Sequence, residues 1–165
     1  MIALSDIDAF VIDFDGVLTN NNVHLDENGN EWVSCSRSDG LAFDVLRKLK
    51  MPVYIFSTEA NPVVSARANK LQVPVIQGVK SKPDGIKELA NREGYNLKNI
   101  LYVGNDLNDY YAMQLCGFSF APADSHPKIR KLATVVLKSN GGSGAVRELI
   151  EDVLQLDFLK ILYLK

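Results

Sequence analysis

The stretch Ala9-Phe-Val-Ile-Asp13-Phe-Asp15-Gly16-Val17 decides how this chain folds, because an apolar run ends there in two carboxylates and a glycine. Such a run suits a buried β-strand. Successive side chains of a strand point to opposite sides, so we expect Asp13 and Asp15 on one side and Phe14 against the protein interior. Gly16 permits a tight turn where the chain leaves the strand. Two neighbouring carboxylates repel each other, and a divalent cation makes the pair favourable. An ordinary strand followed by an Asp-Gly turn is the competing interpretation.

The overall composition indicates one globular domain over residues 1–165. Of the 165 residues, 47% are hydrophobic, which is enough for a core. The net charge of −2 argues against a nucleic-acid-binding surface. We find no secretion signal, and no run approaches the roughly 18 to 20 apolar residues of a membrane span. Cys35 and Cys116 are too few and too far apart for a metal site or a disulfide framework, so we expect reduced cysteines in a cytoplasmic protein.

Short apolar runs alternate with longer runs of helical spacing, which predicts an α/β fold with a central parallel sheet covered on both faces by helices. The expected strands lie near residues 7–13, 53–57, 73–76, 100–103, 118–120 and 134–137. The expected helices lie near residues 40–50, 60–72, 83–94, 108–116, 126–132 and 144–156. Pro83 suits the first turn of a helix, and Gly94 and Gly117 suit the exits of two others.

One segment interrupts this alternation, at about residues 20–38. There Val-His-Leu and Glu-Trp-Val-Ser flank Asp26-Glu-Asn-Gly-Asn30, a pattern typical of a β-hairpin with an Asn-Gly turn. The hairpin would project over the carboxyl edge of the sheet, where open α/β sheets bind their ligands. We therefore expect it to serve as a lid or a contact surface.

Polar residues follow the expected strands, and the carboxyl ends of parallel strands converge. Ser57-Thr58-Glu59 follows the second strand, Lys82 follows the third, and Gly104-Asn-Asp-Leu-Asn-Asp109 follows the fourth. Together with the two aspartates of the first strand, this set fits phosphomonoester chemistry, which demands charge neutralisation and positioning.

Each of these residue types has a physical role in that chemistry. Asp13 is the expected nucleophile, and Asp15 the acid that protonates the leaving alkoxide and then the base that activates water. Ser57 would donate a hydrogen bond to a phosphoryl oxygen, and Lys82 would neutralise charge there. The loop at residues 104–109 would hold Mg²⁺ through oxygen ligands.

Each residue taken singly also has an ordinary interpretation. Ser57 and Thr58 could cap the following helix, and Lys82 could be a solvated surface lysine. Residues 105–109 could form a turn and an N-cap. The order of the set, with each member at a strand end, favours the catalytic interpretation.

These motifs resemble those of the haloacid dehalogenase superfamily of phosphatases, in the same order and over about residues 6 to 150. The short hairpin, the lack of a large cap insert, and the stretches Ala123-Asp-Ser-His-Pro127 and Gly141-Gly-Ser-Gly-Ala-Val-Arg-Glu148 resemble its capless branch. That branch contains 3-deoxy-octulosonate 8-phosphate phosphatases and the 9-phosphate phosphatases of nonulosonic (KDN and N-acylneuraminate) acids. The resemblance implies a Rossmannoid three-layer sandwich without a large cap, a magnesium cofactor and a phosphorylated sugar acid as substrate.

The resemblance also implies an assembly. Members of the branch are typically homotetramers whose hairpins pack together, with a neighbouring subunit covering each active site. The apolar tail at about residues 154–165 is expected near such a neighbouring site, with packing on its own domain as the alternative.

Within the branch, the residue two positions after Ser57 separates the two substrate types. Glu59 with Lys70 on the next helix is the pattern of the nonulosonate type, since the octulosonate enzymes usually carry Arg at the first position. The resemblance implies that Glu59 accepts hydrogen bonds from sugar hydroxyls and that Lys70 pairs with the carboxylate of a 2-keto acid. Gly16, Thr58 and Arg67 complete the expected substrate contacts. Arg67 and Lys70 could equally form a solvated stripe on one helical face.

One position departs from the pattern of the family. Where most members have the aspartate that ligates magnesium directly, this chain has Asn105. An amide carbonyl can coordinate magnesium, but it removes one negative charge, so the affinity for the metal should fall. The expected metal set is therefore Asp13, Asp15 and Asn105, with Asp106 and Asp109.

Four functions remain in competition. The leading hypothesis is a magnesium-dependent phosphatase that releases phosphate from a nonulosonate 9-phosphate through an aspartyl-phosphate intermediate, and the first alternative is an octulosonate 8-phosphate phosphatase. The second alternative is a weakly active or non-catalytic assembly domain associated with a cytidylyltransferase. A related domain of the vertebrate CMP-sialate synthetases has Asn at the position of Asn105 but lacks the nucleophile, which Asp13 retains here. A phosphoacceptor receiver domain is disfavoured, because its acceptor lies on a later strand.

Overall fold

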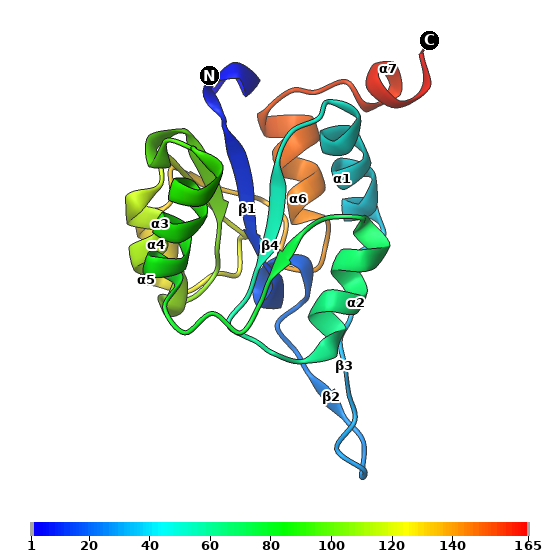
Figure 1. Ribbon diagram of the computed structural model, residues 1–165. Helices are drawn as coiled ribbons and strands as arrows, with labels where there is room; N and C mark the ends of the chain where they lie inside the picture. Colours follow the sequence, from blue (N-terminus) through cyan, green and yellow to red (C-terminus); the bar gives the residue numbers. More distant parts are fainter. Residues whose placement is uncertain (1, 165) are drawn as a thin grey trace.

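A parallel six-stranded sheet organises the molecule (Figure 1), a computed structural model that describes residues 2–164. Its strand order is β5-β4-β1-β6-β7-β8, and all neighbouring strands run parallel. The chain builds outward in both directions from β1, and such a switch in strand order is where open sheets bind ligands. The strands are β1 (Ala9–Asp13), β4 (Val53–Phe56), β5 (Val75–Ile76), β6 (Ile100–Val103), β7 (Phe118–Ala121) and β8 (Val135–Val136).

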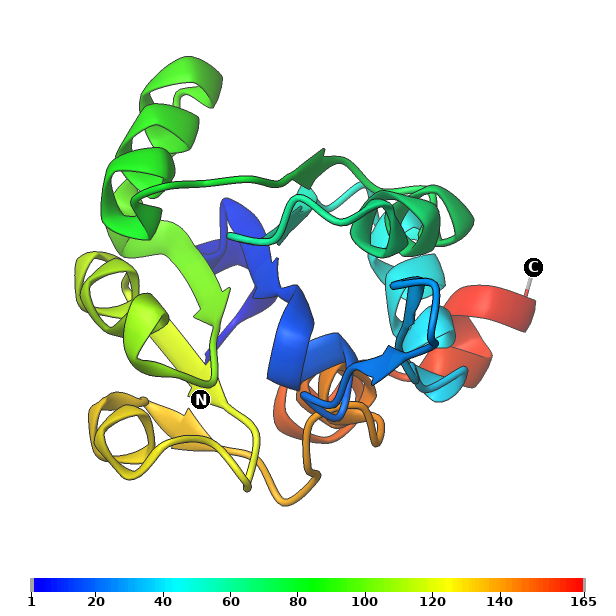
Figure 2. The same ribbon diagram turned by 90° about the horizontal axis from the view of Figure 1, so that it is seen from below.

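Helices cover both faces of the sheet, which confirms the predicted three-layer α/β fold (Figures 1 and 2). One layer contains α3 (Lys82–Glu93), α4 (Tyr110–Leu115) and α5 (Pro127–Leu132). The other contains α1 (Ser38–Lys48), α2 (Pro62–Leu71), α6 (Ala145–Glu148), which continues through a helical segment at Leu149–Val153, and α7 (Phe158–Tyr163). The predicted elements match these bounds to within a few residues, apart from α7.

The two layers explain why β1 is apolar at every position before its first aspartate. Phe10 and Ile12 belong to the core cluster formed with α1, α2 and α6, whereas Ala9 and Val11 belong to the cluster formed with α3, α4 and α5. A strand buried on both faces gains from apolar side chains on each, at about 25 cal/mol per Å² of apolar surface removed from water.

The predicted hairpin is present, with shorter strands than the sequence pattern suggested. β2 (His24–Leu25) pairs antiparallel with β3 (Glu31–Trp32), and the pair projects beyond the carboxyl edge of the sheet (Figure 1). Gly29 supplies the left-handed backbone of the turn, with φ of 80°. The Asp26 carboxylate accepts hydrogen bonds from the backbone amides of Asn28 and Asn30, at 2.9 and 2.8 Å.

The two glycines predicted at helix exits play different roles. Gly94 adopts the left-handed C-cap of α3, with φ of 77°, as predicted. Gly117 was predicted to end the helix before it, but α4 ends at Leu115 and the extended Cys116 forms its C-cap. Gly117 is required by close packing instead, since a Cβ there would lie 1.7 Å from the Lys98 carbonyl oxygen.

The apolar tail forms a helix, α7, that the sequence analysis did not predict. It packs on its own domain against α1, where Lys48 Nζ donates a hydrogen bond to the Leu162 carbonyl at 3.0 Å and Phe158 is buried. It lies at the end of the molecule opposite the hairpin (Figure 1). Within residues 2–164, no helix is long and apolar enough to cross a membrane.

Candidate active site

A cavity of about 350 Å³ opens at the carboxyl edge of the sheet, beside the end of β1. A ligand cavity of this size lies in the range expected for small molecules. It brings together the predicted residues of the first, second and fourth strand ends. Its lining residues are Asp13, Asp15, Asn21, Ser57, Thr58, Asn105, Asp106, Leu107 and Asn108.

The turn after β1 sets the two aspartates in place. Asp13 is the last residue of the strand, and Phe14 is fully buried, so the predicted alternation holds. The Asp13 Oδ1 atom accepts a hydrogen bond from the Phe14 backbone amide at 2.8 Å. Gly16 has φ of 79°, and a Cβ there would lie 1.9 Å from Asn105 Nδ2. The glycine therefore permits both the turn and the close approach of Asn105.

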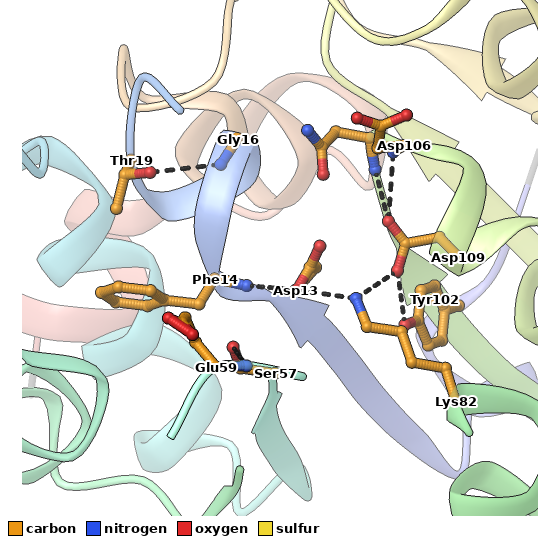
Figure 3. Close-up of polar contacts among 11 residues, drawn as sticks. Asp13, Phe14, Gly16, Thr19, Ser57, Glu59, Lys82, Tyr102, Asp106 and Asp109 are labelled. Carbon is orange, nitrogen blue, oxygen red and sulfur yellow. Dashed lines mark hydrogen bonds and ion pairs between the residues drawn. The ribbon is translucent and has the colours of Figure 1, made fainter. Parts of the chain in front are cut away.

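Lys82 is buried and forms an ion pair with Asp13, the candidate nucleophile (Figure 3). Its Nζ atom lies 2.9 Å from Asp13 Oδ1 and 2.6 Å from Asp109 Oδ1. Burial alone would lower the pKa of Lys82, but the two carboxylates outweigh it and raise that pKa. Burial and the Asp109 charge raise the pKa of Asp13 well above its usual value, and Lys82 opposes this shift. The interpretation of Lys82 as a solvated surface residue is wrong.

Asp109 positions Lys82 and is saturated with donors. Its Oδ1 accepts hydrogen bonds from Lys82 and from the Tyr102 hydroxyl, at 2.6 and 2.8 Å. Its Oδ2 accepts from the backbone amides of Asn105 and Asp106, at 2.9 and 3.2 Å. Four donors satisfy the lone pairs of a carboxylate, so the structure contradicts the predicted direct metal role of Asp109. Tyr102 was missed, although a tyrosine in an apolar strand signals a buried hydrogen-bond partner.

Asn105 faces two oxygen atoms and gives the site a possible ligand set for magnesium. The side-chain amide atom that points into the site lies 3.2 Å from Asp13 Oδ2 and 2.9 Å from the Asp15 carbonyl oxygen. In octahedral magnesium, bonds of 2.0 to 2.1 Å place neighbouring ligand oxygens about 2.9 Å apart. With its oxygen inward, the Asn105 amide fits such a site. Turned over, its NH₂ group donates hydrogen bonds to both oxygens.

The set contains few charged ligands. Among the residues that the structure describes, no group of three or more His, Cys, Asp or Glu side chains is arranged to hold a metal. A cation beside Asp13 would therefore depend on the Asp15 carbonyl and the Asn105 amide as well as on the Asp13 carboxylate.

Ser57 is poised to donate a hydrogen bond into the cavity. Its buried Oγ atom accepts a bond from the Glu59 backbone amide at 3.1 Å, which leaves the hydroxyl proton free to be donated. The N-cap of α2 is Asn61, whose side chain accepts from the Val63 amide at 3.0 Å. The interpretation of Ser57 as the helix cap is therefore wrong.

Burial, followed by the Glu59 charge, raises the pKa of Asp15 above its usual value.

The predicted substrate-binding residues are only partly brought to the cavity. Thr58 lines it, and Glu59 lies exposed beside Ser57 (Figure 3). The Arg67 guanidinium instead donates to the Ser36 carbonyl at 2.8 Å. Lys70 is exposed in the last turn of α2, about 12 Å along the helix axis from its first residue. Within one chain, neither basic residue lines the cavity.

Asp106 serves as an N-cap, as the ordinary interpretation of this loop predicted. Its Oδ1 atom accepts a hydrogen bond from the Leu107 amide at 2.7 Å and so begins the 3₁₀ helix at Leu107–Asp109. The residue also lines the cavity, so its carboxylate adds negative charge to the rim.

Comparison with known proteins identifies the family of this chain. The model of the haloacid dehalogenase-like hydrolases matches residues 54–150. The 3-deoxy-D-manno-octulosonate 8-phosphate phosphatase of Haemophilus influenzae is 31% identical over 153 residues, covering 92% of this chain and 85% of the relative.

Solved structures agree. A protein described as a HAD family hydrolase from Streptomyces avermitilis is 42% identical, with a TM-score of 0.89, covering 92% of this chain and 87% of that one. The 3-deoxy-D-manno-octulosonate 8-phosphate phosphatase of Moraxella catarrhalis, solved with magnesium, phosphate and KDO, is 28% identical, with a TM-score of 0.87 and coverages of 91% and 87%. The predicted resemblance is confirmed: this chain belongs to the haloacid dehalogenase-like hydrolases and is a phosphatase of that family.

Proposed function

We propose that this phosphatase hydrolyses the phosphomonoester of a 2-keto-3-deoxy sugar acid through an aspartyl-phosphate on Asp13. The observation that carries the proposal is the buried ion pair of Lys82 with Asp13, 2.9 Å apart, in a cavity that Asp15 also lines. The name of the Haemophilus relative and the ligands of the Moraxella relative support the class of substrate.

The chain's own residues divide the reaction into two displacements. In the first, an Asp13 oxygen attacks phosphorus, the ester P–O bond breaks, and Asp15 gives its proton to the leaving alkoxide. In the second, Asp15 takes a proton from water, the water oxygen attacks phosphorus, and the P–O bond to Asp13 breaks, which releases inorganic phosphate and restores the Asp13 carboxylate. Lys82 and the Ser57 hydroxyl neutralise and orient the phosphoryl oxygens.

Magnesium is the cofactor of this proposal, and its ligands would be Asp13, the Asp15 carbonyl and Asn105. When bound, it offsets the negative charge that gathers between Asp13 and the phosphoryl group. The Moraxella relative holds magnesium together with phosphate, which supports the same use here.

Two sugar acids compete as the substrate. The curated relatives favour 3-deoxy-octulosonate 8-phosphate. Glu59, which lies exposed beside Ser57 where the octulosonate enzymes usually carry Arg, favours the nonulosonate 9-phosphate type. The position of Lys70 gives that second type no support within a single chain.

A phosphate-release assay on both sugar acid phosphates tests the proposal. The wild type should turn over at least one of them in the presence of magnesium, and Asp13→Asn should abolish that turnover. Asp6→Asn, outside the cavity near the N-terminus, is the matched control and should keep full activity. Turnover that survives Asp13→Asn would refute the nucleophile. No turnover of either sugar, with no magnesium binding by calorimetry, would instead favour the assembly-domain alternative.

The predicted homotetramer through the hairpins is also part of the proposal. Leu25 is 64% exposed and Trp32 is 50% exposed, so each hairpin presents apolar surface for burial between subunits. Light scattering should give the mass of four chains, and Trp32→Ser should lower it. The predicted place of the tail near a neighbouring active site has no support within one chain, because α7 packs against α1 at the end opposite the hairpin. The cytoplasmic location stays a prediction.

A further inference from the structure

Asn21 stands on the wall of the catalytic cavity and has no part in the chemistry described above. It is exposed, and its backbone is left-handed, with φ of 64°. Asparagine tolerates this conformation better than other residues that carry a side chain, but it remains uncommon. Such backbone strain tends to occur at functional sites, where the surrounding structure holds it in place.

The surrounding structure does hold this residue firmly. The Thr19 side chain is fully buried, and its Oγ1 atom accepts hydrogen bonds from the backbone amides of Gly16 and Asn21, both at 3.1 Å (Figure 3 shows the first). Thr19 also forms a β-bridge with Cys35, at the far side of the hairpin. One hydroxyl group therefore fixes the position of Asn21 relative to the turn that carries Asp15.

The Asn21 side-chain amide is free to bind a ligand. Across residues 2–164, it makes no hydrogen bond to protein. An amide offers two donors and an acceptor. It is also neutral, so it adds no repulsion toward a phosphate dianion in a cavity that already contains the carboxylates of Asp13, Asp15 and Asp106.

We propose that Asn21 is a substrate-positioning residue, whose amide hydrogen-bonds hydroxyl groups of the substrate next to the phosphoester. This rests on the proposed function, because it requires a hydroxylated phosphomonoester. It assigns to this chain a specificity contact on the segment that follows the turn after β1 and is tied to that turn through Thr19.

The test is Asn21→Gly, because glycine adopts φ of 64° without strain and removes only the side chain. Michaelis–Menten kinetics are measured with 3-deoxy-octulosonate 8-phosphate, a nonulosonate 9-phosphate, arabinose 5-phosphate and p-nitrophenyl phosphate, which lacks sugar hydroxyls. For the best hydroxylated substrate, kcat/KM should fall about threefold to tenfold, the effect of one neutral hydrogen bond. The value for p-nitrophenyl phosphate should not change.

Two further variants sharpen the outcome. Asn21→Asp places a negative charge beside the phosphate dianion and should raise KM for every substrate in the panel. Asn22→Gly, at the exposed neighbour outside the cavity lining, is the matched control and should change nothing. Equal losses on all substrates for Asn21→Gly, or no loss on any, would overturn the inference. If the wild type turns over neither sugar acid phosphate, only the proposed substrate is refuted, because turnover of arabinose 5-phosphate still measures the effect of Asn21→Gly. If the wild type turns over none of the three hydroxylated esters, the inference is overturned as well.

Discussion

Replacing Asp39 by asparagine should stabilise this protein above neutral pH. Asp39 lies in the first turn of α1 and is 1% exposed. Its Oδ1 atom accepts a hydrogen bond from the Arg147 backbone amide at 3.0 Å, at the start of α6. Its Oδ2 atom is buried without a partner in the part of the chain that the structure describes. A charge held there pays a desolvation cost that a neutral amide avoids.

The size of the effect follows from the pKa of Asp39. Burial raises this pKa from 3.8 to about 6, and the hydrogen bond from the Arg147 amide only partly opposes the shift. The folded state therefore binds the proton more tightly than the unfolded state. The resulting stability is complete below about pH 4 and is lost as the pH rises through about 6. A shift of roughly two units corresponds to about 3 kcal/mol.

The assay is urea denaturation of wild type and Asp39→Asn between pH 4 and pH 8, with EDTA present to exclude metal binding. The two proteins should have similar free energies of unfolding at pH 4, and the variant should be more stable by up to about 3 kcal/mol at pH 8. Asp44→Asn is the control, because Asp44 is exposed on the same helix and pairs with Arg47, a type of contact worth at most about 1 kcal/mol. A difference between Asp39→Asn and wild type that does not change with pH would refute the reasoning.

Three further changes test the active site. Asn105→Asp should tighten magnesium binding by about tenfold or more in calorimetry, because it adds a carboxylate beside Asp13. For the same reason, and because the amide donor is lost, it should destabilise the metal-free protein. Weaker magnesium binding would contradict the ligand set. Tyr102→Phe should lower the free energy of unfolding by about 1.5 to 3 kcal/mol, since a bond to the buried Asp109 carboxylate is lost; an unchanged urea midpoint would contradict this. Lys82→Met should cost about 3 to 5 kcal/mol and abolish phosphate release, because it leaves Asp13 and Asp109 buried without their cation; a stable, active variant would refute the role of the ion pair.

The sheet and its order of elements could be predicted because burial dictates composition directly. The continuous apolar run before Asp13 indicates a strand covered on both faces, and both core clusters contain its residues. The α7 helix was missed because its formation depends on packing against α1 and not on a local pattern. The role of Gly117 was likewise hidden, since the closeness of the Lys98 carbonyl is a tertiary contact.

The site residues at the strand ends could be predicted from the sequence, whereas the contacts that hold them in place could not. Asp13, Ser57 and Asn105 line one cavity because parallel strands bring their carboxyl ends together. The donors to Asp109 could not be read from the sequence, because two are backbone amides and a third, Tyr102, looks like an ordinary core residue. Asn21 was missed because its left-handed conformation depends on the Thr19 hydroxyl.

The glycine loop before α6 links the turn that carries Asp15 to residues far along the chain. The Gly142 amide donates a hydrogen bond to the Val17 carbonyl at 2.9 Å, and a Cβ on Gly141 would lie 2.1 Å from the Gly16 carbonyl oxygen. Asp13 is made well before the backbone that supports its turn, because Gly141 and Gly142 follow it by more than 120 residues. A ribosome-bound chain ending near residue 140 would hold every predicted catalytic side chain and still lack the support for Gly16. We therefore expect phosphatase activity to appear only after the loop at residues 141–142 has docked against the turn.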